Sequence, residues 1–180
     1  MKPQDIIILL KVFLKEPGSW TIARIAHELF MSKSEVSLGI RRLKESGLAR
    51  DSLDFKCAVP NVSAMEEFLL HGLKYTFPAI EGRVMRGMPT SHSAPPLSNI
   101  MTDDKDDVYV WPYEFGNSRG RSILPVYKSV PKAAELDNDF YELLVLLDGI
   151  RIGRAREMAL SSKELILRIK AGAERFANAY

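Results

Sequence analysis

Apolar residues recur at intervals of three and four along the first part of the chain, which is the period of amphipathic helices. The pattern predicts a first helix over residues 3–15 and a second that begins after Thr21, which serves as its N-cap. A third helix is expected over residues 33–46, because Ser32 and Glu35 have the S-x-x-E spacing of a capping box. The buried stripe of this third helix is expected to consist of Val36, Ile40 and Leu43.

Turn residues and a change of period follow the third helix. Gly47 is expected to end it, and the β-favouring residues at 48–50 and 55–59 predict two short strands of a hairpin. Gly39 borders the buried stripe, and we expect it to permit a close approach to the second helix. The first sixty residues therefore read as three helices followed by a β-hairpin.

The second half of the chain has a different texture. Seven of the ten prolines fall within residues 75–132, between a predicted helix at 61–74 and two later predicted helices. The aromatic content of 75–132 argues against disorder, so we expect an ordered, irregular segment with β-like runs at 108–111 and 123–127. The later helices are predicted over residues 137–150 and 161–178. The expected fold class is thus α+β.

Composition narrows the function classes. The net charge is +2, and its excess lies in residues 1–60, which hold ten Lys/Arg and seven Asp/Glu. No apolar run approaches eighteen residues, which excludes a membrane-spanning helix, and we interpret the N-terminal run as part of the fold rather than a signal peptide. A single cysteine, Cys57, leaves no internal disulfide and indicates a cytoplasmic protein.

The segments TIARIAHEL, SKSEVSLGIRRLKESGL and LARDSLDFKCAV resemble, in order, the supporting helix, recognition helix and wing of winged helix-turn-helix bacterial transcriptional regulators, with the MarR-like group the nearest comparison. The resemblance covers residues 1–60 and implies a DNA-binding domain there. Residues 61–180 are then a C-terminal domain for sensing, partner binding or dimerisation. Winged helices also dock proteins, so the resemblance implies the fold more directly than the ligand.

One face of the third predicted helix would meet base pairs if this resemblance holds. At 100° per residue, four side chains lie on or beside the face opposite the buried stripe: Ser34, Ser37, Leu38 and Arg41. Arg41 can donate two hydrogen bonds to a guanine edge, the serines can reach bases or phosphates, and Leu38 can contact a thymine methyl. The expected contacts to the DNA backbone are Thr21, Ser32, Lys33, Arg42, Lys44, Arg50 and Lys56.

Aromatic side chains of the second half either form its own core or line a small-ligand pocket. The candidates for such a pocket are Tyr75, Phe77, His92, Trp111 and Tyr113. Ser91 and Ser93 flank His92, which leaves a hydrolase-like site as a remote alternative, although adjacent Ser and His residues do not make a triad. No spacing typical of a zinc, calcium, phosphate-loop or dinucleotide site occurs, so we expect no metal, no cofactor and no enzyme activity.

The sequence therefore predicts a sequence-specific transcriptional regulator that binds double-stranded DNA. A homodimer is expected, because two recognition helices one duplex turn apart read a palindrome. The last helix carries an apolar stripe that packs on its own domain or on a second chain: Ile166, Ile169, Ala173, Phe176 and Tyr180. A small-molecule effector or a protein partner is compatible with this reading. The alternative is a protein-docking module, such as the antitoxin-like half of a two-protein system.

Overall fold

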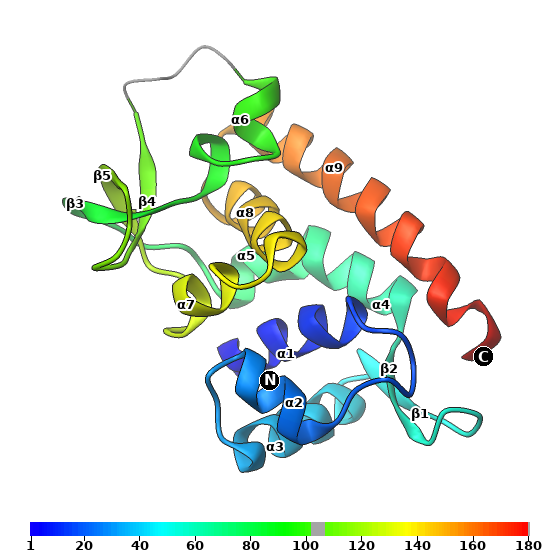
Figure 1. The fold of residues 1–180 in the computed structure, drawn as a ribbon. Helices are drawn as coiled ribbons and strands as arrows, with labels where there is room; N and C mark the ends of the chain where they lie inside the picture. The colour runs from blue at the N-terminus through cyan, green and yellow to red at the C-terminus, as the bar shows by residue number, and fades with distance from the viewer. Residues whose placement is uncertain (102–106, 180) are drawn as a thin grey trace.

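The computed structural model describes residues 1–101 and 107–179 and has a mixed α+β fold, with mostly helical structure and two small sheets (Figure 1). The expected α+β class is confirmed at this level. The helices of the N-terminal part are α1 (Pro3–Phe13), α2 (Ile22–Glu28) and α3 (Lys33–Glu45). They are followed by the antiparallel strands β1 (Ala49–Ser52) and β2 (Cys57–Pro60), so the predicted order of elements is present.

Capping side chains begin these helices where the sequence predicts. The Thr21 hydroxyl accepts a hydrogen bond from the Arg24 N–H at the start of α2. Ser32 and Glu35 form the expected capping box of α3. Gly47 follows the end of that helix with a positive φ of 75°, a conformation that favours glycine. Local hydrogen bonding therefore fixes the ends of α2 and α3.

The predicted helix at 61–74 is present in three pieces. They are α4 (Val62–Glu67), a π-helical turn η1 (Phe68–Gly72) and α5 (Leu73–Thr76). Asn61 caps α4 through its side-chain oxygen, which accepts from the Ala64 N–H. The buried side chains of this stretch, Met65, Leu69 and Leu73, face the same core as α1.

Residues 75–132 contain more regular structure than the sequence predicts. The strands β3 (Glu81–Pro89), β4 (Tyr109–Pro112) and β5 (Ser118–Ile123) pair with one another into a small closed sheet. In it, β3 is antiparallel to both other strands, and β4 and β5 are parallel. The short helices are α6 (Leu97–Ile100) and α7 (Val130–Ala134), with a 3₁₀ turn η2 (Ser91–Ser93) before α6. The expected strand at 108–111 corresponds to β4, whereas the run expected at 123–127 lies mostly beyond β5.

Glycine explains why β3 and β5 were missed. A Cβ on Gly87 would lie 2.0 Å from the Trp111 carbonyl oxygen, and one on Gly120 would lie 2.2 Å from the Val108 oxygen. The strands therefore approach backbone to backbone, where no side chain can fit. Glycine at these points interrupts the alternation of apolar and polar residues by which strands are predicted.

Two long helices complete the fold: α8 (Asn138–Ile152) and α9 (Ala155–Ala173), followed by a 3₁₀ segment η3 (Glu174–Ala179). Asp137 caps α8, which begins one residue after the predicted start of the helix. The last helix begins at Ala155, before the expected Ser161, because the Glu157 carboxylate accepts from the Arg154 N–H and caps its start. The charged sequence there resembles a loop, which is why the prediction placed the start too late.

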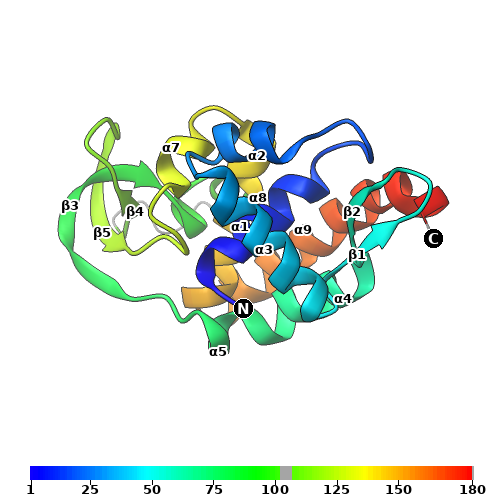
Figure 2. The same ribbon diagram turned by 90° about the horizontal axis from the view of Figure 1, so that it is seen from below.

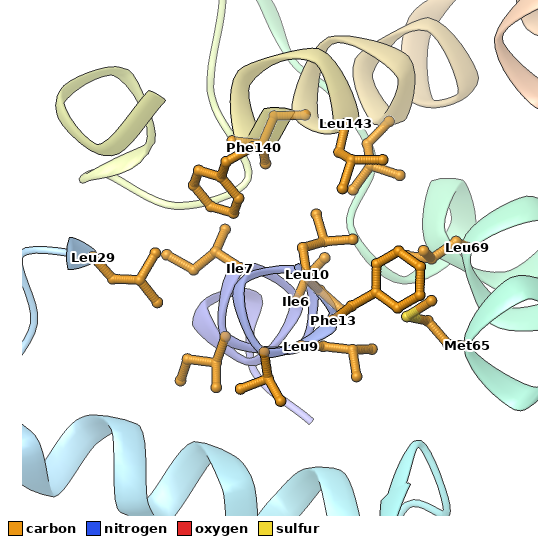
Figure 3. Packing of buried hydrophobic residues seen from close by; sticks show 14 of the residues in the cluster. Ile6, Ile7, Leu9, Leu10, Phe13, Leu29, Met65, Leu69, Phe140 and Leu143 are labelled. Carbon is orange, nitrogen blue, oxygen red and sulfur yellow. The ribbon is translucent and has the colours of Figure 1, made fainter. Parts of the chain in front are cut away.

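The first helix lies at the centre of the core (Figure 3). Its residues from Asp5 to Phe13 are all buried, whereas the sequence predicted one apolar face. Phe140 and Leu143 of α8 cover one side, Met65 and Leu69 cover another, and Leu29 covers a third (Figure 3). Helix α3 also packs on α1. The core around α1 therefore includes side chains from the first sixty residues and from the rest of the chain. A domain boundary after residue 60 remains a prediction.

Helix α8 is buried along most of its length, whereas α9 buries one side only. Within the described residues, no helix has the length and apolar content that a bilayer crossing requires. In the last helix, Ile169 is buried in the protein's own core, as is Phe176 in η3, and Ile166 is half-buried. Tyr180, the last member of the predicted stripe, lies outside the described residues.

Candidate nucleic-acid interface

The face of α3 that the sequence assigns to base contacts lies on the surface. Ser34, Ser37, Leu38 and Arg41 are all exposed. Leu38 has 42% of its surface exposed, although it is apolar, and the Arg41 side chain has 67% exposed. The predicted stripe of Val36, Ile40 and Leu43 is buried on the opposite side. In Figure 2, which views the molecule from below, α3 lies in front of α1.

A groove separates the start of α2 from the first half of α3. Its lining combines apolar, hydroxyl and cationic side chains: Thr21, Ile22, Ala23, Lys33, Ser34, Ser37 and Leu38. Ile22 has 39% of its surface exposed, so this residue and Leu38 give the groove an apolar character. Five of the seven lining residues were predicted as DNA contacts from the sequence. Ile22 and Ala23 were not, because Ile22 reads as a core residue of α2.

The capping box that starts α3 occupies Ser32 completely. Its backbone N–H donates to the Glu35 carboxylate at 3.0 Å, its hydroxyl donates at 2.9 Å, and that hydroxyl also accepts from the Glu35 N–H. The hydrogen bond from the Ser32 backbone, and after it the one from the Ser32 hydroxyl, hold the pKa of Glu35 below its usual value. We predict the Ser32 N–H as a contact for a DNA phosphate, and a phosphate there would compete with the Glu35 carboxylate that already accepts this hydrogen bond.

Arg42 also has an internal partner. Its Nε and Nη2 donate to the two carboxylate oxygens of Asp5, at 2.8 and 2.6 Å, and Asp5 is fully buried. The hydrogen bonding to Asp5 raises the pKa of Arg42. Arg42 thus fixes α3 to α1, and its predicted contact with a DNA phosphate would compete with Asp5. Gly39 serves the same contact: a Cβ there would lie 2.4 Å from Ile8 Cδ1, so it permits close approach to α1 rather than to α2.

The other cations that we predict to contact the DNA backbone differ in whether they already pair with a carboxylate. Lys44 forms an ion pair with Asp51 of β1 at 3.0 Å, and Arg41 lies 3.6 Å from Glu45. Arg50 is half-buried on β1. Lys33 at the start of α3 and Lys56 in the hairpin turn are exposed. The surface around α3 therefore has few cations that are not already close to a carboxylate.

A buried ion-pair cluster holds α2 in place behind this surface. The Lys11 ammonium of α1 lies 3.2 Å from Glu28 of α2 and 2.6 Å from Asp137 at the start of α8, with 2% of its side chain exposed. Burial would raise the pKa of Glu28, but hydrogen bonds from Lys15, Arg24 and Lys11 outweigh it and lower the pKa from 4.5 to about 2. This cluster is not evident from the sequence, because a lysine such as Lys11 is expected on the surface.

Residues that follow β5 also contact the α2–α3 unit. The Tyr127 hydroxyl donates to Glu35 at 3.1 Å, and the Lys132 ammonium lies 4.2 Å from the ring centre of Phe30 in the turn between α2 and α3. Phe30 has a positive φ of 53° and 39% of its surface exposed. Segments far apart in the sequence therefore support the same turn.

The aromatic residues proposed for a ligand pocket do not come together around one cavity. Tyr75 has 77% of its surface exposed on α5, and Phe77 is half-buried against the core. Tyr113 donates to the Glu135 carboxylate at 2.6 Å. Trp111 is buried, and its Nε1 donates to Asp148 at 2.5 Å. These aromatic side chains therefore have separate local contacts, and a shared ligand pocket remains a prediction.

Asp148 instead organises a buried polar cluster that the sequence did not predict. It accepts hydrogen bonds from Thr90 and Trp111 at one oxygen and from Arg151 at the other. Arg151 also donates to the Phe77 and Pro78 carbonyl oxygens. These bonds attach the small sheet to α8 and leave the Asp148 carboxylate fully paired, which indicates a structural role.

His92 is buried nearby and has backbone and carboxylate neighbours. Its Nε2 lies 2.6 Å from the Asp107 carbonyl oxygen and its Nδ1 lies 3.7 Å from Glu157. Ser93 accepts from the Tyr109 N–H, and Ser91 is fully buried. This arrangement has no exposed nucleophile beside the imidazole within the described residues, and it gives the hydrolase-like alternative no support.

No three His, Cys, Asp or Glu side chains in the described part of the chain are grouped to hold a metal ion. The exposed α2–α3 surface is our candidate site, because it combines a groove lined partly by apolar side chains with an exposed helix face of Ser34, Ser37, Leu38 and Arg41. Comparison with known proteins found no matching family model, no matching curated protein and no matching solved structure.

Proposed function

We propose that residues 1–60 form a winged helix-turn-helix and that the protein is a sequence-specific, DNA-binding transcriptional regulator. In this proposal α3 enters the major groove, and the hairpin of β1 and β2 contacts the backbone or the minor groove. The observation that carries it is the α3 face of Ser34, Ser37, Leu38 and Arg41, which is exposed and faces away from α1. The resemblance of the first sixty residues to MarR-like regulators supports the same function.

Each side chain on this face has a chemical counterpart in a major groove. The Arg41 guanidinium can donate two hydrogen bonds to guanine O6 and N7. Ser34 and Ser37 line the protein groove between α2 and α3, and their side chains are short enough to approach base edges or phosphates. Leu38 supplies the apolar contact that a thymine methyl offers. Lys33, Thr21 and Lys56 are exposed and remain our candidates for backbone contacts.

A second candidate function is protein docking, as in the antitoxin-like half of a two-protein system. The observation that favours it is the exposed apolar character of Ile22, Phe30 and Leu38 around the α2–α3 turn. The internal pairing of Arg42 and Lys44 also lowers the positive charge that DNA would meet. In this case the surface would bind a partner's apolar side chains and show little dependence on salt.

A binding selection from a randomised duplex library, followed by affinity measurements over a salt series, tests the proposal. We expect an enriched motif and a steep loss of affinity with salt. Arg41→Ala should relax the preference at one base position at a cost of about 1–3 kcal/mol, whereas Lys56→Ala should weaken all sequences alike. If neither variant differs from the parent, the groove assignment is wrong. Stoichiometric co-purification of a partner without DNA would favour docking.

A further inference from the structure

A pair of arginines lies on the outer face of the small sheet. Arg86 of β3 and Arg119 of β5 are directly opposite each other in the antiparallel register, and both are exposed. Side chains at such positions share one face, with Cβ atoms about 5 Å apart. Like charges placed in this way destabilise a sheet, so the pair calls for a reason other than stability.

No carboxylate offsets this pair among the residues that the structure describes. The neighbouring Arg121, by contrast, pairs with Glu81 at 3.3 Å and Asp107 at 2.9 Å. Arginines elsewhere in the molecule are also paired, such as Arg42 with Asp5 and Arg168 with Glu142. The charges of Arg86 and Arg119 therefore remain available to an external anion.

One of the two guanidinium groups is held in position. The Arg86 Nε donates to the Gly116 carbonyl oxygen at 2.6 Å, and neither terminal nitrogen has a hydrogen-bond partner in the part of the chain that the structure describes. An arginine fixed at Nε loses little conformational freedom when it binds, and its terminal nitrogens suit a phosphate. Phe115, next to Gly116, has 71% of its surface exposed, so the charged face borders an exposed aromatic ring.

Most cations around α3 are already paired with carboxylates. Arg42 is committed to Asp5 and Lys44 to Asp51, while Arg41 lies near Glu45. The α3 surface therefore has few cations for phosphates, although phosphate neutralisation supplies much of the affinity of DNA-binding proteins. Further cations elsewhere on the molecule are needed to hold the duplex.

We infer that the outer face of β3 and β5, through Arg86 and Arg119, is a second contact for the phosphate backbone of the same DNA. The inference rests on the proposed function and adds to its footprint. Figure 2 shows the sheet at one end of the molecule, and Figure 1 shows that it is set back from α3. Only DNA that flanks the α3 site, curved towards the protein, would reach this face.

Duplex length separates the two contacts. The test uses the motif selected by the full-length parent, placed in a duplex of about one helical turn and in one of about three turns. On the long duplex, the double variant Arg86→Ser, Arg119→Ser should bind about tenfold more weakly near physiological salt. Its plot of log affinity against log salt should be shallower by about 2, since each phosphate contact contributes about 0.9. On the short duplex it should match the parent.

Two controls keep the result specific. Lys163→Ser, Lys170→Ser removes the same charge from exposed positions on α9 and should leave both affinities unchanged. Arg119→Ser alone should leave the Tm equal to that of the parent or higher, because it relieves the like-charge pair. A lower Tm would instead give Arg119 a structural role and would overturn the inference.

The remaining outcomes also decide. An unchanged salt slope on the long duplex, an equal loss on the short one, or an equal loss in the α9 control overturns the inference. Competition with polyglutamate gives a further outcome. If polyglutamate displaces the labelled duplex from the parent as well as unlabelled DNA does, but not from the double variant, the face binds an acidic protein and the inference is overturned. If Arg41→Ala leaves base preference intact while the sheet variant still changes the slope, the proposed α3 function fails and the phosphate contact stands.

Discussion

Asp5 in α1 and Arg42 in α3 form a two-pronged ion pair in which the carboxylate is fully buried and the arginine side chain has 18% exposed. The pair joins the central helix to the helix whose outer face we assign to DNA. Three residues along α3 from Arg42, Gly39 leaves room for Ile8 of the same central helix. The orientation of α3 is therefore set from its inner side, by α1.

Removal of Arg42 should destabilise the protein strongly. Arg42→Ala leaves the Asp5 carboxylate buried without its partner, and we expect the free energy of unfolding to fall by about 3 kcal/mol. Urea denaturation with an unchanged m-value measures it. The neighbouring Arg41→Ala, at an exposed position, serves as the control and should change stability by less than about 0.5 kcal/mol. Equal stability of the two variants would show that the ion pair does not fix α3.

A single methyl group should disrupt the small sheet. Gly87→Ala places a Cβ against the Trp111 carbonyl oxygen, which is backbone and cannot move aside without parting β3 from β4. We expect a loss of about 3 kcal/mol or more, which is in the range of severe overpacking. Thermal unfolding followed by tryptophan fluorescence reports it. Val84→Ala, on the exposed part of the same strand, should be nearly neutral, and a mild effect of Gly87→Ala would mean that the strands are not so close.

Acid should weaken the attachment of α2 through Glu28. Its pKa is about 2 in the folded protein and 4.5 as its ordinary value, so the unfolded state binds the proton more readily. The stabilisation is fully present above pH 4.5 and is lost as the pH falls from 4.5 through 2. The shift corresponds to about 3 kcal/mol at most.

Glu28→Gln measures this contribution. The variant should be less stable than the parent at pH 7, and the difference should shrink as the pH falls from 4.5 towards 2. Denaturant titrations at a series of pH values give the comparison. Asp137, whose pKa is also lowered by hydrogen bonds from Lys11 and the Phe140 N–H that outweigh its burial, remains in the variant and contributes its own acid loss. A stability difference that does not depend on pH would contradict the assignment to Glu28.

The thymine methyl provides a direct test of Leu38. Replacement of the contacted thymine by uracil removes one methyl, and affinity should fall by about 0.8 kcal/mol, or roughly fourfold. Leu38→Ala should bind the thymine duplex more weakly and should no longer distinguish it from the uracil duplex. Fluorescence anisotropy with the two duplexes gives the four affinities. If the variant still prefers thymine, another side chain makes the contact.

Local signals in the sequence predicted the helices well. Thr21, Ser32 and Asp137 are caps whose side chains bond to the backbone three residues on, so their effect depends only on near neighbours. The exposed face of α3 follows from helix period alone. These features required no knowledge of the rest of the fold.

The features that the sequence did not predict depend on contacts between residues far apart in the chain. Arg42 looks like a surface cation until Asp5, far earlier in the chain, is placed beside it. Lys11 becomes a buried residue only because Glu28 and Asp137 surround it. The strand β3 was missed because Gly87 fits a neighbouring backbone, which its own segment does not reveal.

The central place of α1 limits how this molecule can be divided. A fragment that stops near residue 60 would keep Ile7, Leu10 and Phe13 but lose Phe140, Leu143 and Leu69, which cover them. Such a fragment would expose the apolar side chains of α1 to water and would aggregate or bind another apolar surface. Helix α1 therefore belongs to one core with both α3 and α8, so neither part of the chain can be removed without exposing apolar side chains of α1.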